Sequence, residues 1–244
     1  MKIVIAEKYA YLSNFIRSLP AGTTPPDEVI RDHRNILTKV TVDGKVYVVK
    51  QYVRPRFYNR IAYTFFRKSK ARRAYEYAQE LIRRGIGTAD PVAYIEIRKG
   101  GLFHTGFFVS EFIDEPLLLT IEARPDREQL LDEFARFTAD LHAQGIVHHD
   151  YNPQNVLFRK ENERVHFWLI DINRMSFRRS LSKRQCLDGM KRIGFEFPIL
   201  MNYVYLYALK RDWHPEYTLG TFFILRENFL KRPRRKQARK QKKG

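Results

Sequence analysis

The chain has 244 residues, with 45 Lys and Arg against 27 Asp and Glu, and it carries a single cysteine. This length can bury a core as one large domain or as two lobes, whereas one cysteine excludes a domain stapled by intrachain disulfides. The net charge of +18 indicates an anionic partner such as nucleic acid, anionic lipid or a phosphorylated glycan.

Several sequence features bear on the compartment. The lone Cys186 fits a reducing compartment. Residues 1–10 lack the long apolar core of a secretory signal, and residues 199–209 are too few to span a bilayer. We therefore expect a cytoplasmic protein that meets a membrane only at its surface.

The first predicted elements are a helix and a β-hairpin. Residues 9–18 have apolar side chains at helical spacing. Two β-rich runs, residues 36–42 and 45–51, then flank the pair Asp43-Gly44. An Asp-Gly pair between such runs predicts a tight hairpin turn.

Lys50 lies near the end of the second run, in Tyr-Val-Val-Lys. A lysine there matches the kinase lysine that contacts the α and β phosphates of the nucleotide, although an isolated strand lysine is more often simply solvated. No G-x-G-x-x-G motif precedes Lys50. The turn at residues 32–35 would therefore have to cover the phosphates with its backbone amides.

Residues 54–73 are strongly basic and contain interleaved aromatic side chains, among them Phe57, Tyr58, Phe65 and Phe66. Three interpretations stay open. The segment binds RNA by charge and stacking, or it forms an interfacial helix against anionic headgroups or glycan phosphates, or it is a helix with buried aromatics and solvated arginines.

Residues 70–84 predict an amphipathic helix, because alanine and leucine recur on one stripe before Gly85. In kinases the corresponding helix supplies a glutamate that pairs with the nucleotide-binding lysine. We favour Glu76 as the partner of Lys50, with Glu80 as the alternative.

Residues 91–98 and 102–112 predict two strands joined by a Gly-Gly turn. The segment 110–114 that follows is the expected crossover between lobes, where backbone groups would meet adenine. Glu111 is the candidate nucleotide contact in this segment.

A predicted helix over residues 127–144 leads into the run Ile-Val-His-His-Asp-Tyr-Asn-Pro-Gln-Asn-Val-Leu-Phe at residues 146–158. This run places Asp150 and Asn155 five residues apart in a polar turn. In a phosphotransferase catalytic loop the Asp accepts a hydroxyl proton and the Asn helps to hold a metal ion.

Asp171 follows a second apolar run, in Leu-Ile-Asp-Ile-Asn. The polar turn at residues 160–163 lies between two short strands, so we expect Asn155 and Asp171 to face each other across a hairpin and to bind magnesium. Helices are expected at residues 182–192, 198–211 and 216–230, before a polybasic tail that either docks or only solubilises.

These motifs resemble a known family. The ordered set Lys50, Glu76, His148-His149-Asp150, Asn155 and Asp171 is similar to the eukaryotic-like protein kinase fold in its small bacterial form. The likeness is strongest to the lipopolysaccharide kinase (Kdo/WaaP) family, which phosphorylates sugars of the lipopolysaccharide inner core from ATP. The stretches at residues 67–73, 85–88 and 91–94 are also similar to the first lobe of that family.

The resemblance implies an α+β, bilobal protein-kinase-like fold. Its small β-rich N-lobe, over residues 1–113, would contain the nucleotide-binding sheet and helix. Its helical C-lobe, over residues 114–230, would contain the catalytic loop, metal site and acceptor site. Residues 231–244 would be a basic disordered tail.

The resemblance also implies roles for individual residues. Lys50, held by Glu76, would orient the ATP phosphates, and Glu111 would adjoin the nucleotide. Asn155 and Asp171 would bind Mg²⁺. Asp150 would deprotonate a hydroxyl on Kdo or heptose of a lipopolysaccharide precursor, such as Kdo-lipid A, at the inner face of the cell membrane.

The loop departs from regulated protein kinases in ways that favour a glycan or small-molecule acceptor. His149 replaces the arginine that reads a phosphorylated activation loop, and Asn152-Pro153 replaces a lysine-containing stretch. Asp171-Ile172-Asn173 replaces Asp-Phe-Gly. Two alternatives stay open: an atypical protein kinase with RNA-associated partners, and a non-catalytic nucleotide-binding or membrane-docking module. As a partner, nucleic acid is less favoured than a lipopolysaccharide precursor or an anionic membrane surface.

Overall fold

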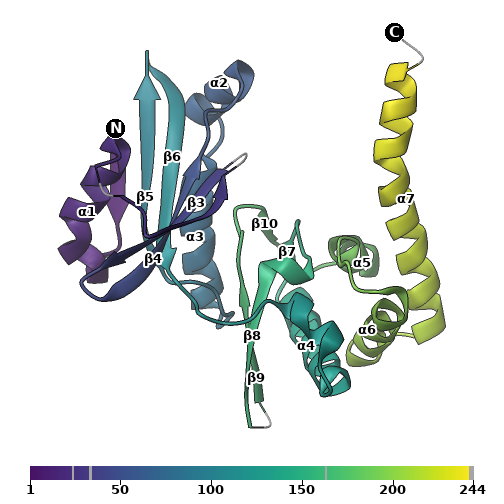
Figure 1. Cartoon of the computed structure of the whole chain (residues 1–244). Helices are drawn as coiled ribbons and strands as arrows, with labels where there is room; N and C mark the ends of the chain where they lie inside the picture. Colours follow the sequence, from purple (N-terminus) through teal and green to yellow (C-terminus); the bar gives the residue numbers. More distant parts are fainter. Residues whose placement is uncertain (24, 33–34, 163, 242–244) are drawn as a thin grey trace. The chain divides into compact units, whose positions relative to one another are not determined.

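The computed structural model describes residues 1–23, 25–32, 35–162 and 164–241, and it divides into two compact units (Figure 1). The first unit comprises Met1–Asp114 together with Asp171–Asn173. The second comprises Glu115–Ile170 and Arg174–Gly244. The boundary expected from the sequence, between residues 113 and 114, is one residue away from that between Asp114 and Glu115.

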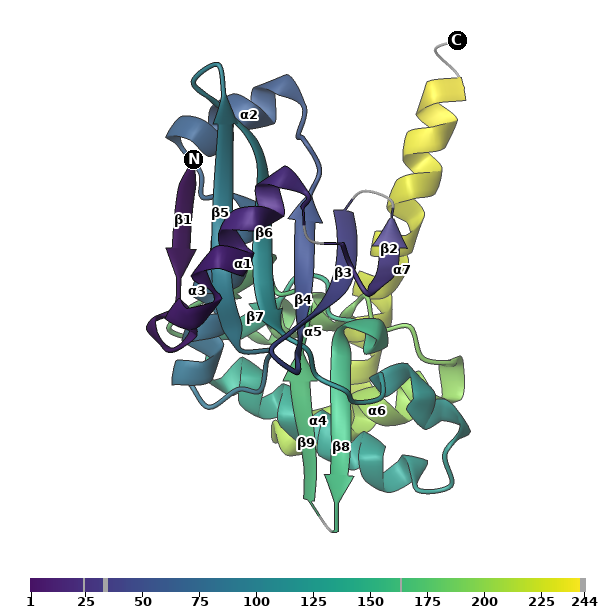
Figure 2. The ribbon, with the colours of Figure 1, turned by 60° about the vertical axis from the view of Figure 1, so that its left-hand side comes forward.

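A six-stranded antiparallel sheet forms the first unit, in the order β1-β5-β6-β4-β3-β2 (Figure 2). Asp43 and Gly44 both have positive φ, 49° and 75°, so the expected hairpin turn between β3 and β4 is confirmed. The strands are β1 (Lys2–Ile5), β2 (Glu28–Asp32), β3 (Asn35–Val42), β4 (Lys45–Tyr52), β5 (Pro91–Lys99) and β6 (Leu102–Glu111).

Helices cover both faces of this sheet. They are η1 (Glu7–Leu12), α1 (Ser13–Ser18), η2 (Leu19–Ala21), α2 (Phe57–Phe65) and α3 (Lys70–Arg83). On one face α1 packs on Tyr47 and Val49 of β4, and on the other α3 packs on Tyr52 (Figure 2). Because side chains alternate along a strand, Lys50 lies on the α3 face with Tyr52.

The second unit combines helices with two small two-stranded sheets, β7 with β10 and β8 with β9. Helix α4 packs against α6, and α6 packs against α7 (Figure 1). The elements are η3 (Leu118–Ala123), α4 (Arg127–Ala143), β7 (Ile146–His148), η4 (Pro153–Asn155), β8 (Val156–Glu161), β9 (Arg164–Leu169), β10 (Met175–Phe177), α5 (Lys183–Met190), α6 (Phe197–Lys210) and α7 (Pro215–Gln241).

A buried aromatic cluster around Phe134 of α4 fixes the loop that contains Asp150 in this unit. The Phe134 ring centroid lies 5.0 Å from that of Tyr203 and 5.7 Å from that of Tyr151. The hydroxyls of Tyr151 and Tyr203 each lie 2.8 Å from Thr138 Oγ1. The residue directly after Asp150 is therefore held by packing and by a buried hydrogen bond.

Three segments differ from the sequence predictions or lie outside the structure. Residues 231–241, expected to be a disordered tail, continue α7 as a helix. The edge strand β2 was not predicted separately. The phosphate-covering turn expected at residues 32–35 includes positions 33–34, which lie outside the described residues. Residues 242–244 of the expected tail also lie outside them. In the part of the chain that is described, no helix is both long and apolar enough to cross a bilayer.

Candidate active site

Lys50 and Asp171 form an ion pair in the first unit. Lys50 Nζ lies 2.5 Å from Asp171 Oδ1, and both side chains are largely buried, with 16% and 30% exposed. The Lys50 ammonium also lies 5.6 Å from the ring centroid of Tyr52. Burial of Tyr52 and the nearby charge of Asp171 together raise the pKa of the Tyr52 phenol. The sequence-predicted lysine and metal-binding aspartate are thus brought together.

Asp171 is held in an unusual backbone conformation. Its φ is 53°, in the left-handed region that non-glycine residues rarely adopt. The Asn173 side chain compensates, because its Nδ2 donates to Asp171 Oδ1 at 2.5 Å and the residue is buried. Such strain often marks functional positions, and here it aims one carboxylate at both Lys50 and Asn173.

Glu76 does not pair with Lys50, which corrects the expected ion pair. Its carboxylate instead accepts from Lys68 Nζ at 2.7 Å and Arg72 Nε at 2.8 Å. Partial burial of Glu76 opposes ionisation, but these hydrogen bonds outweigh it and lower the pKa of the carboxyl. The alternative, Glu80, is likewise bound, by Arg83 and Arg84 of its own helix end.

The packing of α3 explains why no glutamate reaches Lys50. The α3 side chains that pack with Tyr52 are Ala71, Ala74 and Tyr75, and none of them is acidic. In this structure the charge of Lys50 is balanced by Asp171 and not by a carboxylate from α3.

The Glu111 side chain lies on the opposite face of the sheet from Lys50. Burial and a hydrogen bond to Glu111 raise the pKa of Tyr9, a residue of the core on the α1 face. The backbone N–H of Glu111 donates to Asp90 O at 3.0 Å. Any nucleotide contact on the Lys50 face would therefore come from the backbone of this segment and not from the Glu111 carboxylate.

The catalytic loop of the second unit is organised around the Asp150 backbone. Asp150 N donates to His148 Nδ1 at 3.1 Å, so the other ring nitrogen of His148 carries the proton and donates to Ile170 O, also at 3.1 Å. The Asp150 carbonyl accepts from Asn152 Nδ2 at 2.8 Å and from Asn155 Nδ2 at 2.9 Å. These bonds hold the loop rigid and leave the Asp150 carboxylate directed elsewhere.

The Asp150 carboxylate faces a cation. Arg192 Nη1 lies 3.6 Å from Asp150 Oδ1, which is an ion-pair distance but too long for a hydrogen bond. Both side chains are about one-third exposed, so the pair is accessible to water. A partly exposed carboxylate at the end of a rigid loop can accept a proton from a bound hydroxyl.

Asn155 and Asp171 each offer an oxygen atom of the kind that magnesium prefers as a ligand. Because Asn155 uses Nδ2 to bind the Asp150 carbonyl, its side-chain oxygen is the atom suited to a hard cation. In the second unit Asn155 pairs with Ile170, since Ile170 N donates to Asn155 O at 3.0 Å. Asp171, which offers a carboxylate, belongs to the first unit. Among the described residues no group of three or more His, Cys, Asp or Glu side chains could hold a metal ion.

Two residues of the candidate site were missed by sequence reasoning. Asn173 stands where protein kinases have a glycine, and a polar residue two positions after the aspartate is well placed to bind its carboxylate. Arg192 gave no signal, because its contact with Asp150 spans 42 positions of a basic chain.

Comparison with known proteins identifies the family. The model of the lipopolysaccharide kinase (Kdo/WaaP) family matches residues 30–214, well over half of the chain. A search of the curated proteins found no match.

Several solved structures share the fold. WaaP in complex with acyl carrier protein has a TM-score of 0.64 at 18% identity, over 93% of this chain and 98% of that chain. Amicoumacin kinase hAmiN in complex with AMP-PNP, Ca²⁺ and Ami has a TM-score of 0.58 at 12% identity, over 91% and 86%. The microcompartment-associated aminopropanol kinase has a TM-score of 0.55 at 11% identity, over 86% and 85%.

The expected α+β, protein-kinase-like fold is confirmed by these likenesses. The family match adds the chemistry, because its members transfer phosphate to a hydroxyl. The chain belongs to the lipopolysaccharide kinase (Kdo/WaaP) family and is a phosphotransferase that acts on a hydroxyl group.

Proposed function

We propose that this enzyme transfers the γ-phosphate of ATP to a hydroxyl of Kdo or heptose in the lipopolysaccharide inner core. The observation that carries the proposal is the Lys50–Asp171 ion pair at 2.5 Å, in a chain of the lipopolysaccharide kinase family. In kinases a lysine and an aspartate of this kind act on the same nucleotide, one on its phosphates and one on its metal ion.

Each residue of the proposed site has one task. Lys50 orients the α and β phosphates, the backbone near Glu111 adjoins adenine, and Asp171 and Asn155 would hold Mg²⁺. The ion would supply neutralisation of phosphate charge. Asp150 accepts the proton of the acceptor hydroxyl. The hydroxyl oxygen bonds to the γ-phosphorus as the bond between that phosphorus and the leaving ADP breaks. Glu76 remains with Lys68 and Arg72 and has no part in this step.

The acceptor is membrane-anchored, so we include docking at the cytoplasmic face of the cell membrane. Helix α2 supports this, because Phe57, Tyr58, Phe65 and Phe66 at and beside its ends are between 61% and 85% exposed. Exposed aromatic rings among arginines suit the interface of an anionic bilayer.

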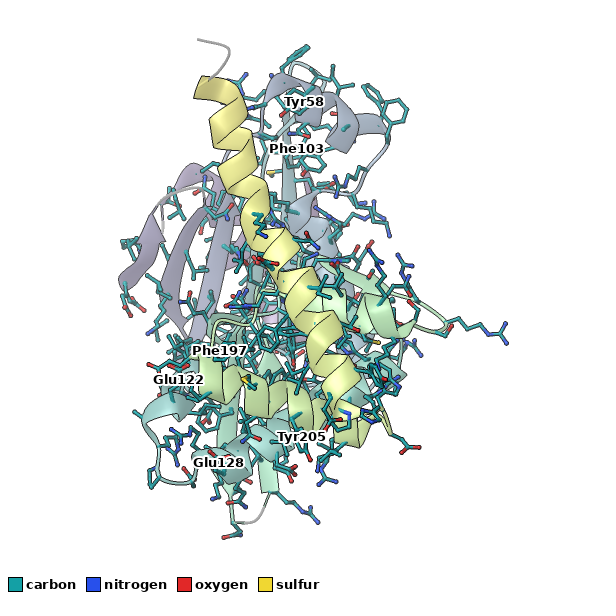
Figure 3. All side chains as sticks on the ribbon, turned by 90° about the vertical axis from the view of Figure 1, so that its right-hand side faces the viewer. Tyr58, Phe103, Glu122, Glu128, Phe197 and Tyr205 are labelled. Atoms are coloured by element: carbon teal, nitrogen blue, oxygen red, sulfur yellow. The ribbon has the colours of Figure 1, made fainter. Side chains whose placement is uncertain are left out.

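Helix α2 is firmly attached to the sheet of its own unit. Arg60 Nε donates to Phe103 O at 2.9 Å, and Phe103 N donates to Thr64 Oγ1 at 2.8 Å. Figure 3 marks the helix and strand β6 by Tyr58 and Phe103. The exposed rings therefore project from a fixed helix and not from a loose segment.

Incubation of the purified chain with labelled ATP tests the proposal. One reaction contains Kdo-lipid A and the other a protein and RNA extract. Label should enter the lipid, and mass spectrometry should find one added phosphate on its sugar region. Label that enters only polypeptide, or ATP binding without transfer in either mixture, would show the proposal to be wrong.

A further inference from the structure

A pocket lies beside Asp150, entirely within the second unit. Its volume is about 300 Å³, and its walls include Asp150 and Asn152 of the catalytic loop, Lys191 and Arg192 after α5, and Arg226 and Phe229 of α7. Ligand pockets in proteins begin at roughly this size. Because Asp150 lines this pocket, a hydroxyl bound in it lies beside the Asp150 side chain.

The charge of the pocket lining is mainly positive, and most of it is already engaged. Lys191 Nζ binds Asp188 Oδ2 at 2.6 Å. Arg226 Nη1 binds the carbonyls of Lys191, at 3.0 Å, and of Ile193, and burial lowers the pKa of the Arg226 guanidinium. Arg226 therefore pins the backbone of the turn that carries Arg192.

Arg192 is differently placed. Within the described part of the chain its side chain makes no hydrogen bond, and its charged neighbour is Asp150 at 3.6 Å. Its guanidinium carbon lies 4.6 Å from the ring centroid of Phe229, so the group is held against an aromatic ring. A stacked guanidinium keeps its edge N–H groups for bidentate binding of a carboxylate or phosphate.

Helix α7 supports this wall. It lies across α6, which Phe197 and Tyr205 mark in Figure 3. The Phe197 and Phe223 rings are 5.4 Å apart, and Phe222 is buried. Phe229 follows two turns later on the same helix, so its position is set by packing of the helix and not by a loop.

We propose that the pocket binds an acceptor carrying a carboxylate or phosphate next to the hydroxyl that is phosphorylated, and that Arg192, stacked on Phe229, binds this anion. An anion close to the Asp150 carboxylate is repelled unless a cation lies between or beside them, and Arg192 is that cation. The inference rests on the proposed function, because the pocket is an acceptor site only if Asp150 is the base.

Acceptor binding and phosphate transfer are measured separately on the full chain. The probes are Kdo-lipid A in detergent micelles, the same lipid with its Kdo carboxylate converted to a neutral amide, and the same lipid without its lipid A phosphates. The variants are Arg192→Gln, Arg192→Lys and Phe229→Leu. Arg136→Gln, which removes an equal charge from the exposed side of α4, is the control.

Arg192→Gln should weaken binding of Kdo-lipid A and raise its KM by about 10- to 100-fold, as expected for loss of a charge-assisted hydrogen bond. The KM for ATP should not change. Arg192→Lys should recover part of the lost affinity for Kdo-lipid A. Phe229→Leu should raise the KM for Kdo-lipid A by about twofold to fivefold, and Arg136→Gln should leave it unchanged. If wild type and Arg192→Gln bind one of the two neutralised lipids equally well, the anion removed from that lipid is the one that Arg192 binds.

Equal binding of Kdo-lipid A by wild type and Arg192→Gln would overturn the inference, as would tight binding of both neutralised lipids or no binding by wild type. The proposed function fails differently. If wild type binds the lipid in an Arg192-dependent way but transfers no phosphate, the anion site stands and the proposed reaction is wrong.

Discussion

Lys50 of β4 and Asp171 form an ion pair, although 121 positions separate them in the sequence. The proposed role of Lys50 is to bind nucleotide phosphates when ATP is present. Lys50→Met should therefore lower kcat/KM by about 100- to 1,000-fold, as measured by ADP release in the presence of Kdo-lipid A.

The matched control is Lys45→Met, at the exposed start of the same strand. It should keep wild-type activity. A Lys50→Met enzyme with more than a tenth of the wild-type rate would show that the ion pair serves stability only.

Asp150→Asn, at the proposed base, should slow transfer by about 100- to 10,000-fold, because the amide cannot accept the hydroxyl proton. ATP binding, measured by fluorescence of a nucleotide analogue, should be unchanged. Asp140→Asn, on the exposed side of α4, is the control. Retained transfer in Asp150→Asn would mean that another group is the base.

Glu76→Gln should leave kcat within about twofold of wild type, because Glu76 contacts Lys68 and Arg72 and not Lys50. Partly exposed ion pairs of this kind contribute less than about 1 kcal/mol, so the free energy of unfolding in urea should change little. A large loss of activity in this variant would instead indicate that α3 rearranges to bring Glu76 to Lys50.

Asn173→Ala should raise the Mg²⁺ concentration needed for half-maximal activity by about tenfold or more. Asn173 binds the carboxylate of Asp171, the proposed magnesium ligand, and loss of a side chain that orients a metal ligand typically weakens metal binding by that factor. A magnesium titration of initial rates measures the effect, with the exposed Asn14→Ala as control. An unchanged titration curve would remove Asn173 from the site.

A Phe65→Ser/Phe66→Ser double variant should bind anionic vesicles at least about tenfold more weakly in a sedimentation assay, because two exposed rings are lost. High salt should weaken wild-type binding as well. Tyr217→Ser, which removes another exposed ring, 74% exposed, should bind as wild type does. Equal binding by the double variant would exclude α2 as the membrane contact.

Strong local signals in the sequence predicted much of the fold. The Asp43-Gly44 turn has a backbone requirement that few residue pairs meet, and the expected helix at residues 70–84 matches α3 (Lys70–Arg83). The β pattern that begins at Val29 did not separate β2 from β3, because β2 is an edge strand with exposed Val29 and Ile30 and no alternation of burial marks it.

The error at Glu76 could have been avoided by helical geometry. At about 100° per residue, Glu76 lies about 200° around the helix from Ala74, on the side opposite the apolar stripe. A stripe that packs on the sheet therefore turns Glu76 away from it. The apolar stripe alone predicts that Glu76 points away from the sheet, whereas the kinase pattern predicts that it points toward Lys50.

The tail at residues 231–241 was expected to be disordered but is helical. A polybasic run predicts disorder in isolation, yet residues 231–241 extend a helix that is already formed, and lysine, arginine and glutamine are good helix formers. Adding residues to an existing helix avoids the cost of nucleation. The composition of the tail alone does not show that a formed helix precedes it.

Because α7 runs without a break from the wall of the pocket beside Asp150 to Gln241, removal of the last residues would do more than remove positive charge. A helix cut after residue 230 would place Phe229 in a fraying terminal turn, whose carbonyls lack partners. Reduced acceptor affinity in such a truncated enzyme would then reflect a less rigid Phe229 ring beside Arg192. It would not show that the basic residues themselves contact lipid.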